Sequence, residues 1–268
     1  MVRSRQQPAE ALIEQSWAAH GWLDALDEAR LQEPSVLPGW SVSAVVAHLV
    51  MVHAGFVRLL DRPSAERPLP MEGLVARYRR DVAALDRATA DVLEGRSGRE
   101  LVAELGVAID ALAARLGPGE ALPPVLATPR GPVSLPDFVA TRVVEVVVHA
   151  DDLSRSLPAL DPVPLLRGAL GTCSRALTAI LEERHPGRSV EVRVPPYAAV
   201  QCSVVRGGVA DPGPTHTRGT PPNVVETDAL TWLRLATGRT TWADAFGAGL
   251  VAASGLRADL SEMLPLLS

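Results

Sequence analysis

Apolar side chains recur at helical spacing over most of the first 185 residues. Between Pro8 and Leu31, leucine, isoleucine and tryptophan side chains return every three to five positions, which is typical of an amphipathic helix. The segment 34–40 holds two prolines and a glycine and interrupts this pattern, and Ser41 or Ser43 can cap the next helix. The same criteria predict helices at residues 8–31, 41–61, 71–95, 100–116, 134–156 and 165–185.

The pattern changes after Gly187, where polar and apolar side chains begin to alternate as in a half-buried strand. The expected elements are strands at 189–194, 198–205, 224–226 and 250–253, and helices at 228–237, 242–246 and 258–267. These elements predict an α+β protein of two domains. A helical bundle occupies residues 1–187, and a small α/β domain occupies residues 188–268.

The composition excludes several kinds of chemistry. All 26 basic residues are arginines, so the chain has no lysine for a Schiff base, for pyridoxal phosphate or for a phosphate-binding loop of the GxxxxGK[ST] type. A net charge of −5 and only 4% aromatic residues argue against a nucleic-acid partner, which would favour a basic face with stacking aromatics.

The cysteines and the apolar segments bear on the compartment. Cys173 and Cys202 are too far apart for a CxxC motif, and two cysteines make no disulfide framework. The first fifteen residues lack the apolar centre of a signal peptide, and no segment is read as approaching a membrane span. We therefore expect a cytoplasmic protein that does not associate with a membrane.

The strongest candidate for chemistry lies in a valine-rich segment, residues 143–149. Glu145 and His149 are four residues apart, which places them on one face of a helix. A carboxylate among valines needs a proton, a partner or a cation, and His48 lies in a similar apolar setting on another predicted helix. One interpretation is a three-ligand metal site with a free position for water or substrate. Its donors suit zinc, with nickel, iron and manganese as further candidates. The alternative is a pair of core histidines and a glutamate paired with Arg142.

Three further residues are candidates for binding a cofactor. Asp152, three residues after His149, can hydrogen-bond a ligand histidine or can be a solvated carboxylate. Arg142 can pair with Glu145 or meet an anionic ligand, and Arg239 can contact an anion or cap a helix. His53 lies about 140° round its helix from His48 and is not expected to join them. We assign no catalytic residue.

Two segments carry a resemblance to a known family. The stretches LPGWSVSAVVAHL (37–49) and RVVEVVVHADDL (142–153) resemble the motifs of the mycothiol-dependent maleylpyruvate isomerase family, over roughly residues 10–185. That family belongs to the DinB-like metal-binding bundles. The resemblance implies an up-down four-helix bundle with His48, Glu145 and His149 as ligands of a divalent metal, and mycothiol as the thiol cofactor.

The C-terminal part carries a second resemblance. Segments 214–228, 232–239 and 253–261 resemble the sterol-carrier-like domain of actinobacterial proteins, which often follows an isomerase-type bundle. This label describes a fold and does not imply that a sterol binds.

Together these features favour a metal-dependent isomerase or transferase. A metal-activated mycothiol thiolate would add to a small electrophilic substrate. One alternative is a non-catalytic protein whose second domain holds a small apolar ligand, with the bundle as a scaffold that keeps a structural or vestigial metal. Another is an interaction module, which would expose a large apolar patch. The expected partners are a small-molecule substrate and a low-molecular-weight thiol, and the expected assembly is a monomer or a homodimer.

Overall fold

The computed structural model describes residues 2–78, 82–211, 213 and 222–267. Its helices are α1 (Val2–Asp24), α2 (Glu28–Leu31), α3 (Val42–Leu59), α4 (Met71–Tyr78), α5 (Val82–Leu93), α6 (Gly98–Leu116), α7 (Leu135–Ser156), α8 (Arg167–Arg184), α9 (Ala229–Ala236) and α10 (Trp242–Gly247). Its strands are β1 (Val125–Thr128), β2 (Gly131–Ser134), β3 (Pro186–Val194), β4 (Ala198–Cys202), β5 (Val204–Arg206), β6 (Val209–Asp211), β7 (Val224–Thr227) and β8 (Val251–Ser254). The predicted α+β organisation, a helical domain followed by a domain that contains a sheet, is confirmed.

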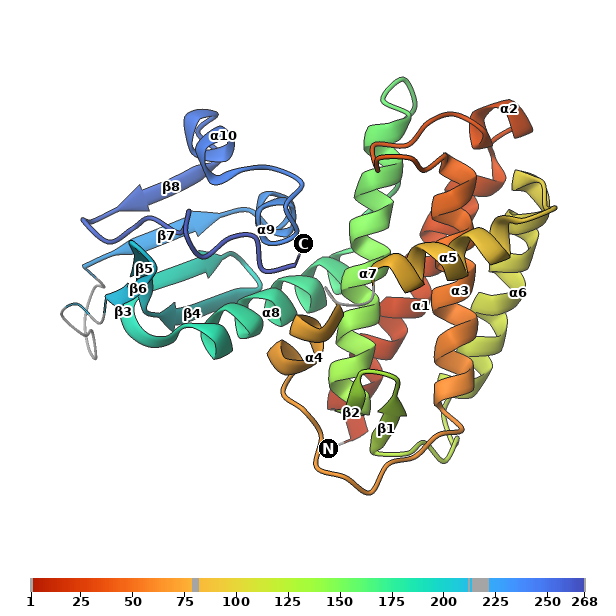
Figure 1. Cartoon of the computed structure of the whole chain (residues 1–268), viewed down its shortest axis with the longest axis horizontal. Helices are drawn as coiled ribbons and strands as arrows, with labels where there is room; N and C mark the ends of the chain where they lie inside the picture. Colours follow the sequence, from red (N-terminus) through yellow and green to blue (C-terminus); the bar gives the residue numbers. More distant parts are fainter. Residues whose placement is uncertain (1, 79–81, 212, 214–221, 268) are drawn as a thin grey trace. The chain divides into compact units, whose positions relative to one another are not determined.

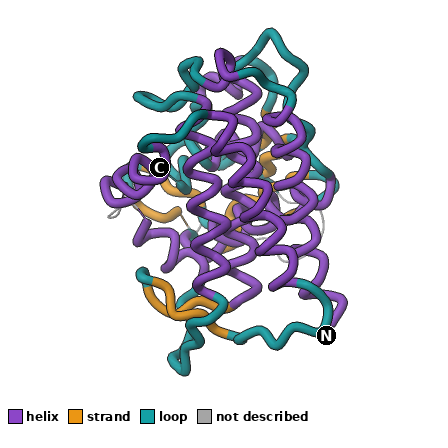
Figure 2. The backbone as a smooth tube through the Cα atoms, turned by 90° about the vertical axis from the view of Figure 1, so that its right-hand side faces the viewer, coloured by secondary structure: helices purple, strands orange, loops and turns teal. Residues whose placement is uncertain are grey.

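The first unit, residues 1–169, is built around the four long helices α1, α3, α6 and α7 (Figures 1 and 2). Helix α6 packs between α1 and α3, and α7 packs against α1 and α3 on the opposite side. The start of α6 meets the start of α3 at Ser43, and Arg99 at that start binds Asp24 at the end of α1. Hence α3 and α6 run in one direction and α1 runs in the other. Ser156 at the end of α7 bonds to Val36 before α3, which makes α7 antiparallel to α3. The order along the chain is therefore up-down-down-up, and not the up-down alternation that the resemblance implied; the long connection through α4 and α5 allows the parallel pair.

Helix α3 is longer and more apolar than the sequence analysis expected of any segment. By length and composition alone α3 could cross a membrane, although no segment was expected to approach this. However, 67% of this segment is buried inside the bundle. A helix that lies in a core is apolar on nearly all sides, so its hydropathy reflects its central position.

The region between α3 and α7 differs from the expected elements. The single helix expected over 71–95 is described as α4 and α5, with residues 79–81 outside the described part. A two-residue turn joins β1 and β2 into an antiparallel hairpin that the sequence did not predict. The strands of this hairpin are only four residues long and contain Gly131 and Pro132, which obscure a period of two.

The second unit, residues 170–268, is built on a four-stranded sheet in the order β4-β3-β7-β8. Strands β3 and β7 are parallel, and the other neighbours are antiparallel. Alternate residues of β3, namely Val190, Val192 and Val194, are buried. Glu191 and Arg193 lie on the opposite side of the sheet, where they form an ion pair with a distance of 2.6 Å between Nε and Oε1. The strand that was predicted from this alternation is confirmed.

The prediction of a helix over residues 258–267 is wrong. The segment forms turns, and its backbone N–H groups at Leu266 and Leu267 donate to the carbonyl oxygen of Ala236 at the end of α9. Leu260, Met263 and Leu266 are buried at intervals of three, so the turns satisfy the same apolar spacing as a helix would. Pro265 lacks the N–H that a helix would use.

The contacts divide the chain before most of α8, whereas the sequence analysis places the boundary after residue 187. The change of pattern at Gly187 marks the step from α8 into β3, which both belong to the second unit. A change from helical to strand periodicity therefore need not coincide with a domain boundary.

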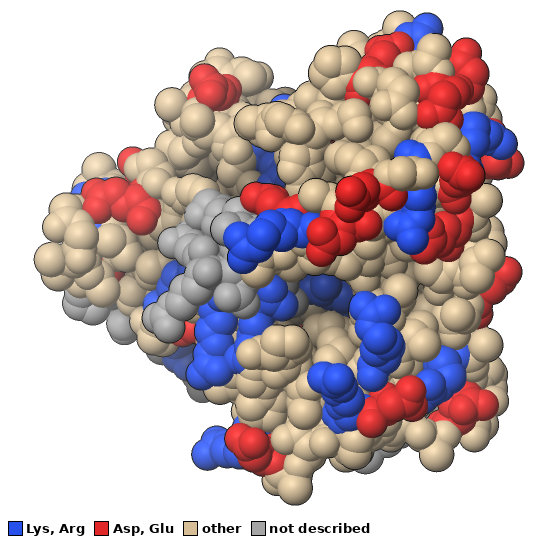
Figure 3. All heavy atoms as spheres, turned by 45° about the vertical axis from the view of Figure 1, so that its right-hand side comes forward, with Lys and Arg blue, Asp and Glu red and all other residues tan. Residues whose placement is uncertain are grey.

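Charged side chains of both signs are interspersed on the face that Figure 3 shows. On the first unit, Arg115 binds Asp61 with an N···O distance of 2.8 Å, and Arg99 binds Asp24 at 3.1 Å. Exposed pairs of this kind contribute little to stability. The expected absence of a nucleic-acid partner stays a prediction.

His53 joins α3 to α1 in the core. Its Nε2 atom lies 2.8 Å from Oγ of Ser16, and its Nδ1 atom lies 2.7 Å from the carbonyl oxygen of Leu49. Burial lowers the pKa of His53 to about 4, so the ring is neutral in the folded chain and Nδ1–H donates to Leu49. As expected from the sequence, the ring of His53 does not join His48 in the cluster with Glu145 and His149.

We expect His53 to make the fold sensitive to acid. Between pH 6.5 and 4 the unfolded chain takes up a proton at this residue and the folded chain does not. The free energy of unfolding therefore falls with pH in this window, by up to about 3 kcal/mol from His53. Chemical denaturation of the wild type and of His53→Gln between pH 4.5 and 7 measures this term. The prediction fails if both proteins lose stability equally over this range.

Candidate metal centre

His48 is held in the second turn of α3. Ser41 caps this helix, since its Oγ atom accepts a hydrogen bond from the N–H of Ala44 at 3.2 Å. Before the cap, Gly39 has φ of +79°, a left-handed conformation that favours glycine, and so the chain turns sharply into the helix. The turn brings the half-buried Trp40 against His48, with 5.5 Å between the ring centroids.

Glu145 and His149 lie in the middle of α7. Ser134 caps this helix, and Pro136 occupies its first turn, where a missing N–H costs nothing. Valines around the two polar residues are buried against the neighbouring helices. The spacing of four residues directs both polar side chains to the same face, toward α3.

The three predicted ligands converge. Nε2 of His48 lies 2.7 Å from Oε1 of Glu145, and Nε2 of His149 lies 3.4 Å from the same oxygen. One ligand atom of each residue lies within 4.8 Å of the other two, and the histidine rings are 4.8 Å apart between centroids.

This donor set fits a divalent metal. Ligand atoms about 2.0–2.2 Å from a zinc ion lie roughly 3–3.5 Å from one another, close to the observed separations. Two imidazole nitrogens and one carboxylate oxygen also leave a coordination position for water or substrate, as in catalytic zinc sites. Small movements of these side chains would complete such a site.

Each of the three candidate ligands has a polar neighbour on its outer side. Oδ2 of the fully buried Asp152 lies 3.2 Å from Nδ1 of His149, so the solvated-carboxylate interpretation of Asp152 is wrong. Nη2 of Arg142 lies 3.5 Å from Oε2 of Glu145, and its guanidinium lies over the ring of Phe138 at 5.0 Å. These contacts orient the ligands.

The third neighbour is Thr89 on α5, which the sequence analysis missed. Its Oγ1 atom lies 3.4 Å from Nδ1 of His48. No local motif marks this residue, because the contact joins two helices that lie far apart in the sequence. The only available signal was a threonine in a predicted helix.

The electrostatics of the site separate the two histidines. Burial opposes protonation of His149, but its hydrogen bonds to Asp152 and Glu145 outweigh burial and raise its pKa to about 9. Burial lowers the pKa of His48, and its hydrogen bond to Glu145 offsets this only in part. Burial also opposes ionisation of Glu145, yet its contacts with both histidines and with Arg142 hold its pKa well below the usual range.

The site is reached through Glu145. Its side chain is 24% exposed, compared with 7% for His48 and 10% for His149. The ligand nitrogens are therefore shielded, and a small ligand would approach beside the carboxylate.

The structure does not bring all the predicted residues together. Arg239 lies in the second unit, where its Nη1 atom donates to the carbonyl oxygen of Thr237 at 2.9 Å. This contact agrees with the helix-end interpretation of Arg239, and a role in binding a cofactor stays a prediction. His216, weighed as part of a functional loop, lies outside the described residues.

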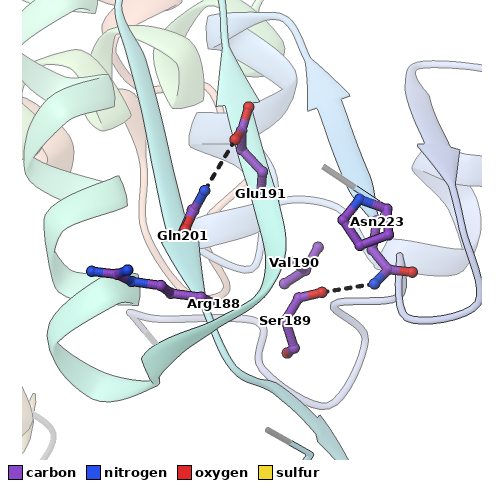
Figure 4. A pocket seen from close by; sticks show the side chains of 7 residues that line it. Arg188, Ser189, Val190, Glu191, Gln201 and Asn223 are labelled. Carbon is purple, nitrogen blue, oxygen red and sulfur yellow. Dashed lines mark hydrogen bonds between the residues drawn. The ribbon is translucent and has the colours of Figure 1, made fainter. Parts of the chain in front are cut away.

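The second unit has a small recess beside β3, lined by Arg188, Ser189, Val190, Glu191, Gln201, Pro222 and Asn223 (Figure 4). Its space of about 140 Å³ includes open solvent, so it is a shallow hollow and not an enclosed ligand cavity. Asn223 donates to the carbonyl oxygen of Ser189 at 2.8 Å, and Gln201 donates to Glu191 at 3.4 Å. The recess therefore gives no support to binding of a lipid.

Comparison with known proteins agrees with this architecture. Residues 13–154 match the family model described as mycothiol maleylpyruvate isomerase N-terminal domain. Residues 166–266 match a second model, described as bacterial SCP ortholog. No curated protein sequence matches the chain.

Two solved structures share the fold. They are crystal structures of the mycothiol-dependent maleylpyruvate isomerase and of a mutant of it in which alanine replaces a histidine. Both are 17% identical to this chain, with TM-scores of 0.58 and 0.59, and each alignment covers 93% of this chain and 92% of the other. Because the first family model spans more than half of the sequence, the chain belongs to the mycothiol maleylpyruvate isomerase N-terminal domain family.

Proposed function

We propose that this protein is a metal-dependent enzyme that uses mycothiol to isomerise, or to add a thiol to, a small electrophilic substrate. The observation that carries the proposal is the convergence of His48, Glu145 and His149 in a shielded site that opens beside Glu145. Membership of the isomerase family supports the choice of thiol and of substrate class. We further propose a cytoplasmic protein that acts as a monomer or a homodimer. The two cysteines are buried and free, in agreement with a reducing compartment.

The residues of the chain have distinct parts in this proposal. A divalent metal, with zinc as the first candidate and nickel as the second, supplies a Lewis-acid position that lowers the pKa of a bound thiol. His48, Glu145 and His149 would hold it. Asp152 keeps Nδ1 of His149 hydrogen-bonded, which directs Nε2 toward Glu145. Arg142 contacts Oε2 of Glu145, which leaves Oε1 facing the two imidazoles.

The direct test compares the chelator-treated chain with the same chain reloaded with zinc. We expect cis–trans isomerisation of maleylpyruvate, or conjugation of mycothiol to a chromogenic electrophile, to require both zinc and mycothiol. After substitution with Co²⁺, mycothiol should produce a near-ultraviolet absorption band typical of a cobalt–thiolate bond. A fully loaded chain that shows neither turnover nor this band would exclude the thiol-dependent function.

Asp152 offers a graded test of the metal site. At pH 9, where the proton on His149 competes little with zinc in either protein, we expect Asp152→Asn to weaken zinc binding by about 10–100-fold, because an amide is a poorer acceptor for the Nδ1–H of His149. Competition with a chromogenic chelator measures this change. The half-buried Asp137, on the same helix but in its first turn, provides the matched control, and Asp137→Asn should bind zinc as the wild type does. Equal affinity of the Asp152 variant and the wild type would remove Asp152 from the site.

A further inference from the structure

Thr89 occupies an unusual place on α5. Among residues 84–93, the part of this helix whose side chains are described, Thr89 is the only buried one, with 2% exposure. Threonine is a poor helix former, so propensity does not explain its presence. Its position on the buried side of an otherwise open helix directs the side chain into the bundle, where α5 packs on α3.

The hydroxyl of Thr89 is directed away from its own helix. Thr178 in α8 and Thr237 directly after α9, both buried, donate to the carbonyl oxygen four residues earlier. Thr89 makes no such bond within the described residues, and its Oγ1 atom instead lies 3.4 Å from Nδ1 of His48. The threonine therefore contacts a candidate ligand on the nitrogen that faces away from Glu145.

This hydrogen bond must change direction when Nε2 of His48 binds a metal. In the present geometry Nε2–H donates to Glu145 at 2.7 Å, so the neutral ring has a lone pair on Nδ1 and Thr89 donates to it. A metal on Nε2 requires a lone pair there, and the ring proton then sits on Nδ1. Thr89 must now accept. A hydroxyl can do both, since it is a donor and an acceptor, whereas a carboxylate only accepts.

We propose that Thr89 is a positioning residue for metal binding, which holds His48 through its Nδ1 atom in both tautomers. This inference rests on the proposed metal site. Asp152 has the corresponding position on His149, but a buried carboxylate favours a ring with a proton on Nδ1. The hydroxyl of Thr89 favours neither tautomer, so His48 can release its bond to Glu145 without losing its outer partner.

Two substitutions test the role of the hydroxyl. Thr89→Val keeps the shape of the side chain and removes the hydrogen bond, whereas Thr89→Ser retains the hydroxyl. We expect zinc affinity, measured by chelator competition, to fall about tenfold in Thr89→Val and to stay within about twofold of wild type in Thr89→Ser. Thr178→Val, the same change at a buried threonine outside the site, should bind zinc normally.

Nuclear magnetic resonance reads the tautomer of His48, which must change if the hydrogen bond from Thr89 reverses its direction. Long-range ¹H–¹⁵N spectra should show His48 protonated on Nε2 after chelation and on Nδ1 with zinc. Thermal unfolding in chelator should be nearly the same for Thr89→Val and wild type. Wild-type affinity in Thr89→Val, or an unchanged His48 tautomer, overturns the proposal for Thr89 alone. Failure of the wild type to bind zinc overturns the proposed function as well.

Discussion

A chain in which His48 and His149 are both replaced by alanine should bind no zinc under conditions where the wild type binds about one ion per chain. The loss of one outer hydrogen bond to a ligand costs about 10–100-fold in affinity, so the loss of two direct ligands should cost at least ~10⁴-fold. Metal analysis after gel filtration measures the bound zinc. Saturating zinc, at about 1,000 times its Kd, should stabilise the wild type by about 4 kcal/mol and the variant not at all.

The controls separate metal binding from folding. His20→Ala removes a histidine of α1 that lies outside the cluster and should leave zinc binding unchanged. Because two alanines in the core can themselves destabilise the bundle, Glu145→Gln provides a second variant of nearly the same shape. It should also lose zinc while it folds in chelator. Stoichiometric zinc in the double variant, or a wild type that holds none, would contradict the assignment of these ligands.

The two candidate ligands on α7 could be predicted because local rules of the sequence position them. The spacing of Glu145 and His149 fixes their common face on any helix, and the valines around them predict that this face is buried. His48 is different, because no local rule joins it to α7. Its similar apolar setting on another predicted helix made it a candidate, the resemblance of the two motifs to a family implied it as a ligand, and the structure shows its contact with Glu145 at 2.7 Å.

The residues that surround the ligands were less accessible to sequence reasoning. Asp152 was found as a candidate because it lies one turn after His149 on the same helix, although its burial was left open. Thr89 was missed because its contact depends on how α5 crosses α3, and that crossing depends on the connection between α3 and α6. Likewise, the turns at residues 258–267 are decided by hydrogen bonds to Ala236, which no periodicity records.

Zinc binding should depend strongly on pH, because the cluster stores a proton. With its pKa raised to about 9, His149 is protonated at neutral pH in the metal-free chain, and Nε2 must lose this proton before it can bind a metal. Below pH 9 zinc therefore displaces about one proton per ion, and its affinity should rise about tenfold for each pH unit between 6.5 and 8.5. Chelator competition across this range gives the slope, and calorimetry in buffers of different ionisation enthalpy gives the proton count.

The proton on His149 makes the metal-free fold less stable as the pH rises, which is the opposite of the effect expected from His53. In the metal-free chain, the raised pKa of His149 stabilises the fold below pH 6.5, and up to about 3 kcal/mol of this is lost as pH rises through 9. With zinc bound, His149 is already deprotonated, so this loss should disappear. Asp152→Asn removes one of the hydrogen bonds that raise the pKa of His149. The zinc affinity of this variant should therefore stop rising at a lower pH than the zinc affinity of the wild type. Zinc affinity that is constant from pH 6.5 to 8.5 would show that His149 is neutral, and that its contacts with Asp152 and Glu145 do not outweigh its burial.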